Sequence, residues 1–405
     1  MTGRPAPTPA QPPAVRTNPT AHPMRTAAPG TGSGTPATEH SGTPTTAGTP
    51  GTPPAEDAPA SPDPGSPDPG SLATLTAARP AVPAHAPGAT LAADVGGTWV
   101  RWRAGGAVER VPSPSRLRWP GRAVADLRRD MVELLGRAAP PGARAAVSFG
   151  AAIDHVTGVV HGSAPLWGAA DEPYDLLGAL RAYRPDVTWT LVNDVTAALA
   201  DFAATRARPG TRRVGYLTVS SGIGLRIADL ERSVIPVDGW GLQGEVGHLA
   251  AACPPELAGL VCECGGHGHL ASVAAGPGFV RVAERLGLAG AADVAQWLPG
   301  ALDAGDPAAR RLLGLCVEPV AQLIRTLWCL DPHLDLLGVG GGVVEGLGAH
   351  YAAELRGRLA TPTSYAARGY SPSWLEDRLV LCGPGDVDAL RGAERIGRWA
   401  PRIAP

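Results

Sequence analysis

The chain contains no lysine, and all 35 basic residues among its 405 residues are arginines. This absence excludes a Schiff-base mechanism and a lysine-dependent phosphate loop, because the arginine side chain stays protonated and cannot replace a reactive amine. The formal net charge is only -2, so no strong field favours binding to nucleic acid or to an anionic membrane. No apolar run reaches the roughly 18 residues that a membrane span needs.

Cysteines are also few. The six cysteines are unevenly spaced, which argues against a disulfide framework. Cys316, Cys329 and Cys382 lie in apolar runs and are predicted to be buried thiols in a reducing compartment. The N-terminus lacks the apolar segment of a secretory signal, so we expect a cytoplasmic protein.

Residues 1–88 have almost no aromatic or branched apolar side chains and consist mainly of Pro, Gly, Thr, Ala and Ser. Such a segment cannot bury enough apolar surface to offset the entropy of ordering, and we predict that it is disordered. It also shows no helical periodicity of apolar residues, which disfavours an N-terminal helix-turn-helix. The folded part is expected to begin near Thr90.

A cluster of soft metal ligands stands out after the middle of the chain. His248, Cys262, Cys264 and His269 offer two sulfurs and two nitrogens, which is a closed tetrahedral set for structural zinc. The two cysteines are one residue apart and cannot easily bridge each other, but they can share one ion. Three further candidate ligands lie nearby and leave the ligand set open, namely Cys253, Glu263 and His267.

Three glycine-rich turns follow predicted strands. Leu91–Ala93 predict a short buried strand that leads into Asp94, Gly96, Gly97 and Thr98. Paired glycines let backbone N–H groups approach phosphate oxygens, the Thr98 hydroxyl adds a donor, and Asp94 is suited to hold a hydrated Mg²⁺ ion.

The second and third turns repeat this pattern. A strand over residues 214–220 precedes Ser221, Gly222 and Gly224, and a strand over residues 334–338 precedes Gly340 and Gly341. The glycines of the last turn allow a nucleotide to approach the backbone closely. Just beyond the second turn, Arg226 is suited to reach a phosphate or an acidic group, but we expect it to be a solvated surface residue.

A further strand, Trp189–Val192, ends at Asn193 and Asp194, and a helix is expected over residues 195–204. Polar residues at the carboxyl ends of strands in α/β folds face the ligand crevice. We expect Asn193 to cap the helix while Asp194 faces the crevice. Other helices are expected over residues 124–135, about 308–330 and 390–399, and a last strand over 379–382.

The segment Gly244-Glu245-Val246-Gly247-His248, followed by the Cys262–His269 cluster, resembles the signature of the ROK family, whose name stands for repressors, open reading frames and kinases. The Gly-rich turns and Asp194 occur in that family's order, and the resemblance spans about Thr90 to the C-terminus. The turn over residues 221–224 resembles the family's second phosphate loop. The chain departs from the family pattern at five places: His269 replaces a Cys, Ser220 and Ser221 replace Gly and Thr, Arg226 stands where a Gly is usual, Ala271 replaces a sugar-binding Glu, and Ala164 stands near the place of a sugar-binding Asn.

The resemblance implies an α/β, two-lobe, ribonuclease-H-like fold of the actin and hexokinase type with a zinc-binding loop. It divides the chain into a tail (1–88), an N-terminal α/β lobe (89–200) and a C-terminal α/β lobe (201–405) whose last helix packs back on the first lobe. ATP, Mg²⁺ and a structural Zn²⁺ are the implied cofactors. A homodimer is the implied assembly.

The implied activity belongs to the glucokinase-like sugar-kinase branch. An ATP-dependent kinase would phosphorylate the primary hydroxyl of a hexose or hexose-like polyol, with Asp194 as general base and with Asn193, Glu245 and His248 holding hydroxyls. Ala271 favours a ring other than plain glucose, such as an aminosugar or a C7 cyclitol, and a common hexose is the alternative acceptor. The alternative is a non-catalytic, sugar-sensing regulatory protein of the same family.

Overall fold

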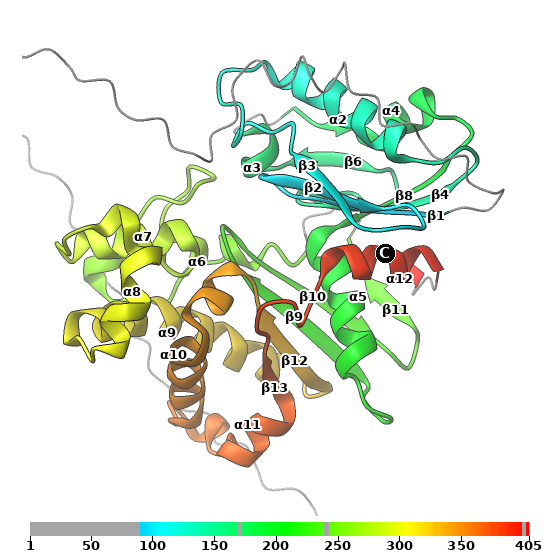
Figure 1. The fold of residues 1–405 in the computed structure, drawn as a ribbon. Coiled ribbons are helices and arrows are strands. Elements are labelled where there is room, and N and C mark those ends of the chain that lie inside the picture. Colours follow the sequence, from blue (N-terminus) through cyan, green and yellow to red (C-terminus); the bar gives the residue numbers. More distant parts are fainter. Residues whose placement is uncertain (1–89, 169–171, 239–242, 399–401, 405) are drawn as a thin grey trace, which may run out of the picture. The chain divides into compact units, whose positions relative to one another are not determined.

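The computed structural model describes residues 90–168, 172–238, 243–398 and 402–404. The tail expected over residues 1–88 therefore lies outside the described residues. All described residues belong to one compact unit, Gly70–Pro405. Two mixed β-sheets with helices against their faces form its framework (Figure 1).

The first sheet has five strands in the order β3-β2-β1-β4-β8. Their bounds are β1 Thr90–Val95, β2 Trp99–Arg103, β3 Glu109–Pro112, β4 Arg144–Phe149 and β8 Thr188–Asn193. β1 to β3 form an antiparallel meander, whereas β4 runs parallel to both β1 and β8. The helices α2 (Val124–Ala138) and α4 (Leu176–Tyr183) lie over one face of this sheet in Figure 1.

Alternating side chains divide the first sheet between two cores. Leu91, Ala93 and Val95 pack with Leu127 of α2 and Leu180 of α4. Ala92 of β1 and Ala146 of β4 face the other way and pack against Leu390 and Ala393 of the closing helix α12 (Ala389–Arg398). A strand places successive side chains on opposite faces, so both faces of this sheet are covered by helices.

The segment between β4 and β8 carries a small antiparallel sheet in the order β5-β6-β7 and a short helix. Their bounds are β5 Ala152–Ile153, β6 Val159–Gly162, α3 Ala164–Trp167 and β7 Tyr174–Asp175. This segment brings Pro165 against the first glycine-rich turn, where a Cβ on Gly97 would lie 2.5 Å from Pro165 Cβ.

The second sheet repeats the order of the first. Its strands are β9 Arg213–Val219, β10 Ile223–Asp229, β11 Val234–Pro236, β12 Leu334–Gly340, β13 Leu379–Leu381 and β14 Arg402–Ala404. From β11 to β13 the order β11-β10-β9-β12-β13 matches β3-β2-β1-β4-β8, again with an antiparallel meander followed by parallel strands. This repeat is the duplication expected from the two similar strand-turn-strand patterns. β14, a strand not expected from the sequence, adds to the edge beside β11.

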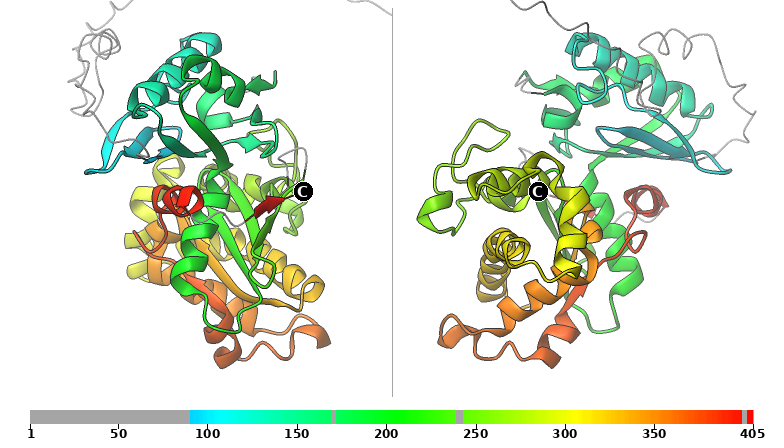
Figure 2. Two further views of the ribbon diagram at one scale, coloured as in Figure 1. Left: turned by 90° about the vertical axis from the view of Figure 1, so that its right-hand side faces the viewer. Right: turned by 60° about the vertical axis from the view of Figure 1, so that its left-hand side comes forward.

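Helices cover the second sheet on both sides. One face packs on α5 (Asp194–Arg206) through Leu199, Phe202 and Tyr216. Six helices pack against the other face or against one another beside it: α6 Leu270–Ala274, α7 Gly276–Arg285, α8 Val294–Asp303, α9 Pro307–Leu330, α10 Gly342–Ala360 and α11 Pro372–Arg378. Figure 2 shows this group of helices apart from α5 and α12.

The longest of these helices, α9, is long and apolar enough to cross a membrane by length and composition alone. However, 61% of its most apolar window is buried inside the fold, as is usual for the central helix of a packed core. Cys316 is buried in it and Cys382 is buried beside β13, as expected, but the prediction for Cys329 is wrong. Cys329 lies near the end of α9 with an exposed side chain, because the core covers only one side of the helix there.

The closing helix α12 contacts β1, β4 and α5 (Figure 1). Its Gly392 lies directly against α5, where an added Cβ would be 1.8 Å from the carbonyl oxygen of Ala197. No side chain larger than hydrogen fits at this crossing without a shift of one helix.

We therefore expect Gly392→Ala to lower the free energy of unfolding by roughly 1–3 kcal/mol, because it forces the two helices apart. Gly357→Ala in α10 is the matched control, since its Cβ would meet nothing within 4 Å. The control should raise stability by up to about 1 kcal/mol through helix propensity. Urea denaturation of both variants measures the difference, and equal effects would contradict the tight crossing.

Candidate active site

The carboxyl ends of three neighbouring parallel strands meet at one edge of the first sheet. Val95 of β1 pairs with Phe149 of β4, which in turn pairs with Asn193 of β8. The next residues, Gly96, Gly150 and Asp194, therefore lie side by side. A Cβ on Gly150 would lie 3.6 Å from Asp194 Oδ2 and 3.9 Å from the Cα of Gly96.

Asn193 and Asp194 join β8 to α5, and they divide two roles between them. The side-chain oxygen of buried Asn193 accepts hydrogen bonds from the N–H groups of Val195 (2.9 Å) and Thr196 (3.4 Å), which caps the helix. Its amide nitrogen donates to the carbonyl of Ala151 at 2.9 Å. This network fixes the backbone, so that the Asp194 carboxylate is held at the strand edge.

The Asp194 carboxylate is in a strongly perturbed environment. Burial, together with repulsion from Asp94 and Glu245, raises its pKa to about 7. The Val195 N–H, at 2.9 Å, and the charge of Arg226 act in the opposite direction and are outweighed. A carboxylate whose pKa lies near neutral pH can both accept and release a proton under physiological conditions.

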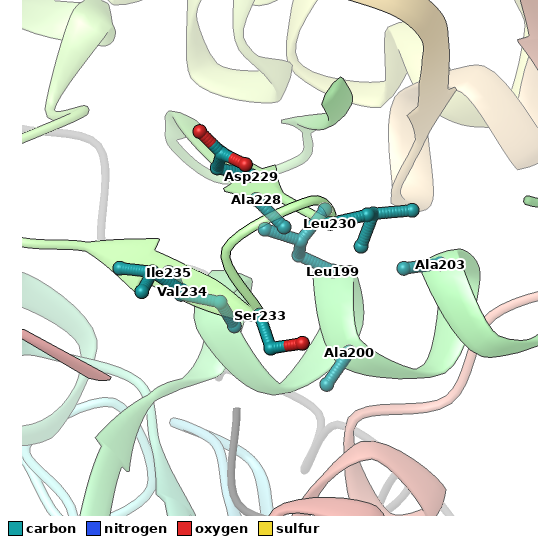
Figure 3. Close-up of a pocket in the computed structure, with 9 residues that line it drawn as sticks. All are labelled: Leu199, Ala200, Ala203, Ala228, Asp229, Leu230, Ser233, Val234 and Ile235. Atoms are coloured by element: carbon teal, nitrogen blue, oxygen red, sulfur yellow. The ribbon is translucent and has the colours of Figure 1, made fainter. Parts of the chain in front are cut away.

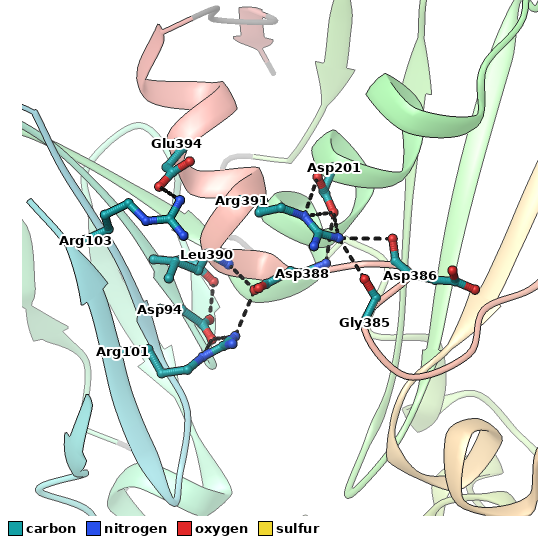
Figure 4. Close-up of polar contacts among 11 residues, drawn as sticks. Asp94, Arg101, Arg103, Asp201, Gly385, Asp386, Asp388, Leu390, Arg391 and Glu394 are labelled. Carbon is teal, nitrogen blue, oxygen red and sulfur yellow. Dashed lines mark hydrogen bonds and ion pairs between the residues drawn. The ribbon is translucent and has the colours of Figure 1, made fainter. Parts of the chain in front are cut away.

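Asp94 lies on β1 and is held by one residue from each neighbouring strand. Arg101 of β2 donates to Asp94 Oδ2 at 2.6 Å (Figure 4). Ser148 of β4 donates to Oδ1 at 2.9 Å. Arg101 also donates to Asp388, just before α12, at 3.0 Å. The residue expected to bind Mg²⁺ is therefore part of an ion-pair network in this structure.

The two expected phosphate turns are both open to solvent at their tips. Thr98 in the first turn is exposed, and so are Ser221 and Gly222 in the second. Each turn is closed by a backbone hydrogen bond, from Gly96 N–H to the Trp99 carbonyl (3.0 Å) and from Ser220 N–H to the Gly222 carbonyl (2.9 Å). N–H groups at the tips are thus available to an anion.

The third turn lies against the second. A Cβ on Gly341, whose φ is +99°, would lie 2.7 Å from Thr218 Oγ1, and one on Gly340 would lie 2.4 Å from the Tyr216 hydroxyl. Gly276 N–H, at the start of α7, donates to the Ser220 carbonyl at 2.8 Å. Gly340 and Gly341 therefore permit close packing against β9, and the N-termini of α7 and α10 both lie near the second turn. Helix N-termini favour phosphate.

The expectation that Arg226 is a solvated surface residue is wrong. Arg226 is 2% exposed, because β10 is covered on both faces and its side chain points toward α5. Its Nε donates to Thr196 Oγ1 at 3.2 Å, and Glu245, Asp194 and Asp238 act on its charge. The signal was available: apolar residues on both sides of this strand predict that both of its faces are buried.

His155 is a second residue that the sequence analysis missed. Its Nε2 lies 3.3 Å from the backbone nitrogen of Asn193 and 3.4 Å from Thr196 Oγ1. Burial and the nearby charge of Arg226 lower its pKa to about 4, so it is neutral at physiological pH. No spacing rule points to it, because it is brought to α5 by the small β5-β6-β7 sheet.

The four expected metal ligands come together. One side-chain donor atom from each of four residues lies within 4.8 Å of the others: His248, Cys262, Cys264 and His269. The separation between sulfur and Nδ1 is 3.8 Å for Cys262 and His248, and 3.3 Å for Cys264 and His269. Two ligands about 2.0–2.3 Å from one tetrahedral zinc ion are separated by about 3.5 Å, so this donor set fits such an ion.

The three alternative ligands lie outside this group among the described residues. His267 faces the carbonyl of Gly259 at 3.2 Å, and Glu263 forms an ion pair with Arg281. Cys253 is partly buried and packs against the core between the second sheet and its covering helices. Backbone hydrogen bonds within the loop, such as Cys262 N–H to the Gly266 carbonyl at 2.7 Å, shape the ligand cluster.

A small apolar pocket elsewhere contains none of the expected site residues. Figure 3 shows it between α5 and the β10–β11 hairpin, lined by Leu199, Ala200, Ala203, Ala228, Asp229, Leu230, Ser233, Val234 and Ile235. The arrangement of functional groups thus singles out the edge of the first sheet and the facing residues of β10 and the Gly244–His248 segment.

A model of the ROK family matches residues 90–371. The chain belongs to the ROK family. A 2-epi-5-epi-valiolone 7-kinase from an Actinoplanes species is 42% identical over 334 residues, which cover 77% of this chain and 92% of the relative. A C(7)-cyclitol 7-kinase from Streptomyces hygroscopicus subsp. jinggangensis is 32% identical over 350 residues, covering 76% of this chain and 97% of the relative.

Solved structures agree on the fold. A ROK family glucokinase from Streptomyces griseus, in complex with glucose and AMPPNP, has a TM-score of 0.56 at 19% identity and covers 77% of this chain and 99% of its own. The expected α/β fold of the ROK sugar kinases is thereby confirmed. The curated relatives are kinases by name, in agreement with the expected kinase of a sugar or cyclitol.

The raised pKa of Asp194 has a consequence for stability. The folded protein holds this proton more tightly than the unfolded chain, whose pKa is near 4, so the stabilising contribution is complete below pH about 4 and is lost as the pH rises to about 7. We expect Asp194→Asn to raise the free energy of unfolding at pH 8 by roughly 1–3 kcal/mol, discounted because the carboxylate is partly exposed. Urea denaturation at pH 5 and pH 8 measures this.

Asp201→Asn is a control with the opposite sign. Burial alone would raise the pKa of Asp201, but donors from Arg391 (2.9 Å), the Asp388 N–H (3.0 Å) and Arg395 (3.0 Å) lower it (Figure 4). Its contribution is present above the unfolded pKa and is lost as the pH falls. The control should therefore lose about 1–3 kcal/mol at pH 8. A decrease in the free energy of unfolding of similar size in both variants would contradict an unfavourable charge on Asp194 in the folded protein.

Proposed function

We propose that this protein is an ATP-dependent kinase that phosphorylates the primary hydroxyl of a C7 cyclitol or a closely related hexose-like ring. The observation that carries the proposal is the position of Asp194 beside the first glycine-rich turn, in a chain 42% identical to a cyclitol 7-kinase. Phosphoryl transfer needs mainly a positioned acceptor and stabilisation of the phosphate charge. Asp194 would position the acceptor, and the glycine-rich turn would stabilise the phosphate charge.

Asp194 is the general base in this proposal. Its carboxylate would accept the proton of the primary hydroxyl as the hydroxyl oxygen attacks the γ-phosphorus, while the bond from that phosphorus to the β,γ-bridging oxygen breaks and ADP leaves. A pKa of about 7 suits this task, because the group is substantially ionised at neutral pH and still binds a proton well. A positioned general base contributes a rate factor of about 10²–10⁴.

Backbone N–H groups at the open tips of the two turns would bind the phosphates, at Gly97 and Thr98 and at Ser221 and Gly222. The Gly96 N–H is already bonded to the Trp99 carbonyl and Gly224 is buried in β10, so these two glycines would shape the turns instead of contacting phosphate. Gly340 and Gly341 would allow the third turn to approach the nucleotide. The Mg²⁺ ion that accompanies ATP would lie near Asp94. Arg101, which pairs with Asp94 at 2.6 Å, would then retain Asp388 as its partner.

Glu245 and His248 would hold hydroxyls of the acceptor. Asn193, also expected to do so, is buried with its side-chain oxygen and nitrogen bonded to the backbone, so it would position Asp194 instead. Ala271, near the start of α6, offers no charge where the family pattern has a carboxylate, and this favours a ring without the anomeric hydroxyls of glucose. The two curated cyclitol kinases are relatives consistent with that preference. Among the expected acceptors, which are hexoses, aminosugars and cyclitols, the proposal therefore favours the cyclitols.

Zinc is part of the proposal as a structural ion. His248, Cys262, Cys264 and His269 would hold it, and it would fix the loop that carries Glu245 and His248 without taking part in the chemistry. The division into lobes at residues 89–200 and 201–405, a homodimer, the absence of nucleic acid and membrane partners, and a cytoplasmic location remain predictions.

The test is phosphoryl transfer from ATP with Mg²⁺ to a panel of glucose, mannose, an aminosugar, 2-epi-5-epi-valiolone and other C7 cyclitols. We expect the best kcat/KM with a cyclitol, and a decrease in kcat of about 10²–10⁴-fold in Asp194→Asn. Because the base must be ionised, kcat/KM should fall as the pH drops below about 7. Asp201→Asn, assayed where it is folded, should keep the wild-type pH profile.

Two outcomes would contradict this function. A best kcat/KM with glucose would reject the cyclitol preference but leave the kinase. No turnover across the panel, together with thermal shifts on adding the same compounds, would favour the non-catalytic sugar-sensing alternative.

The zinc ion is tested separately. We expect about one zinc per chain in the purified protein and in Cys329→Ser, whose thiol is exposed outside the cluster. Cys264→Ser should lose most of the bound zinc and melt at a lower temperature, because the loop loses its internal anchor. Metal analysis and thermal denaturation measure both effects. Full zinc occupancy in Cys264→Ser would reject this ligand set.

A further inference from the structure

The guanidinium of Arg226 is the most deeply buried charge beside the proposed active site. Its side chain is 2% exposed, Nε donates to Thr196 Oγ1 at 3.2 Å, and Nη1 donates to the carbonyl of Leu225 at 3.1 Å. Nη2 is buried and makes no hydrogen bond with any described residue. A buried donor left without an acceptor is costly, so such a group calls for a partner that the described residues do not supply.

The surrounding hydrogen bonds hold this guanidinium in one place. Thr196 Oγ1 accepts from Arg226 Nε, so its own hydrogen is free to reach His155 Nε2 at 3.4 Å. The Asn193 N–H also points at His155 Nε2, at 3.3 Å. His155 therefore acts as an acceptor at Nε2. The chain from Arg226 through Thr196 to His155 ends at the same Asn193 that precedes the proposed base.

The segment that carries Glu245 closes over the other side of Arg226. A Cβ on Gly244 would lie 2.2 Å from Arg226 Nη1 and 1.8 Å from the Leu225 carbonyl oxygen, and Gly244 has a φ of +78°. The Leu225 N–H donates to the Gly244 carbonyl at 2.8 Å. Glu245 follows directly, so the unpaired donor lies next to a segment already expected to hold the acceptor.

The charges around Arg226 indicate which ligand chemistry fits. Glu245, Asp194 and Asp238 all interact electrostatically with the guanidinium, so the carboxylates that act on it outnumber this one cation. An additional phosphate or carboxylate would be repelled by this excess of negative charge. A neutral oxygen with a free lone pair satisfies Nη2 without adding charge, and a ring hydroxyl can in addition donate to Glu245.

We propose that Arg226 is a specificity-determining residue whose Nη2 donates a hydrogen bond to one ring oxygen, hydroxyl or ketone, of the acceptor substrate. The proposal rests on the kinase function proposed above and adds the group that selects the acceptor ring. A substrate that lacks this oxygen would leave a buried donor unpaired. The site would therefore discriminate against it more strongly than a loss of contact area would.

The experiment is a double cycle between Arg226→Gln and deoxy analogues of the cyclitol that the wild-type enzyme accepts. For the wild type, removal of the contacted oxygen should lower kcat/KM by roughly 10- to 100-fold. Arg226→Gln should lower kcat/KM for the parent cyclitol by a similar factor, and removal of the same oxygen should then cost less than about 2-fold. A comparison of the substrates with a ketone and with a hydroxyl at that ring position shows which of the two oxygens Arg226 recognises.

Two further measurements separate contact from a merely structural role. Arg226→Lys keeps a positive charge but loses the guanidinium fork, and it should not restore the discrimination. Arg325→Gln removes another buried arginine, which is 8% exposed in α9 and bonded to the Arg358 and Thr361 carbonyls. It should lower stability yet leave the ratio between the parent and its deoxy analogues unchanged, and KM for ATP should stay the same in both Arg226 variants.

The proposal would be overturned if the decreases in kcat/KM caused by Arg226→Gln and by removal of a ring oxygen simply multiplied at every ring position. Full recovery of the discrimination in Arg226→Lys would also overturn it. Either result would leave Arg226 as a charge-balancing residue. The same cycle on binding, measured by calorimetry with the cyclitol and its analogues, does not depend on turnover. If Arg226→Gln and removal of the ring oxygen are coupled in binding but no compound is phosphorylated, the proposed kinase function is rejected and the Arg226 contact is retained. If compounds are phosphorylated but the two changes are not coupled, the contact is rejected and the kinase function is retained.

Discussion

The register of three parallel strands is the constraint on which the rest of the site depends. Val95, Phe149 and Asn193 are paired across β1, β4 and β8, so the residue that follows each strand is delivered to the same edge. A slip of one strand by one residue would turn Asp194 toward the opposite face of the sheet. The helices α2, α4 and α12 bury alternate side chains on both faces, and this two-sided burial holds the register.

That edge concentrates negative charge, and arginine is the cation that can balance it. Asp94 and Glu245 raise the pKa of Asp194, while Arg101 and Arg226 act against the excess. Burial lowers the pKa of Arg226, yet an arginine begins so high that it remains charged. A lysine in the same surroundings would be far easier to deprotonate. Arginine therefore supplies the permanent positive charge at this site, and the chain needs no lysine there.

Features that depend on short segments were predictable from the sequence. The strand before Asp194, its cap by Asn193, the two similar strand-turn-strand patterns and the cluster of His248 with the two cysteines all follow from local spacing. Arg226 and His155 were missed because their roles depend on burial and on distant contacts. The apolar residues of β10 indicated that Arg226 is buried, but its partners Thr196 and the Gly244–Glu245 segment lie outside that strand. Cys329 looked buried only because its neighbours in sequence are apolar.

The Asp94 carboxylate joins the site to the packing of the closing helix. Arg101 binds Asp94 and Asp388 at once, the Asp388 N–H donates to Asp201, and Arg391 of α12 binds Asp201 as well (Figure 4). A cation that binds Asp94 competes with Arg101 for its oxygens, since both need the same lone pairs. These hydrogen bonds thus connect the Asp94 carboxylate to the region where α12 contacts β1 and α5.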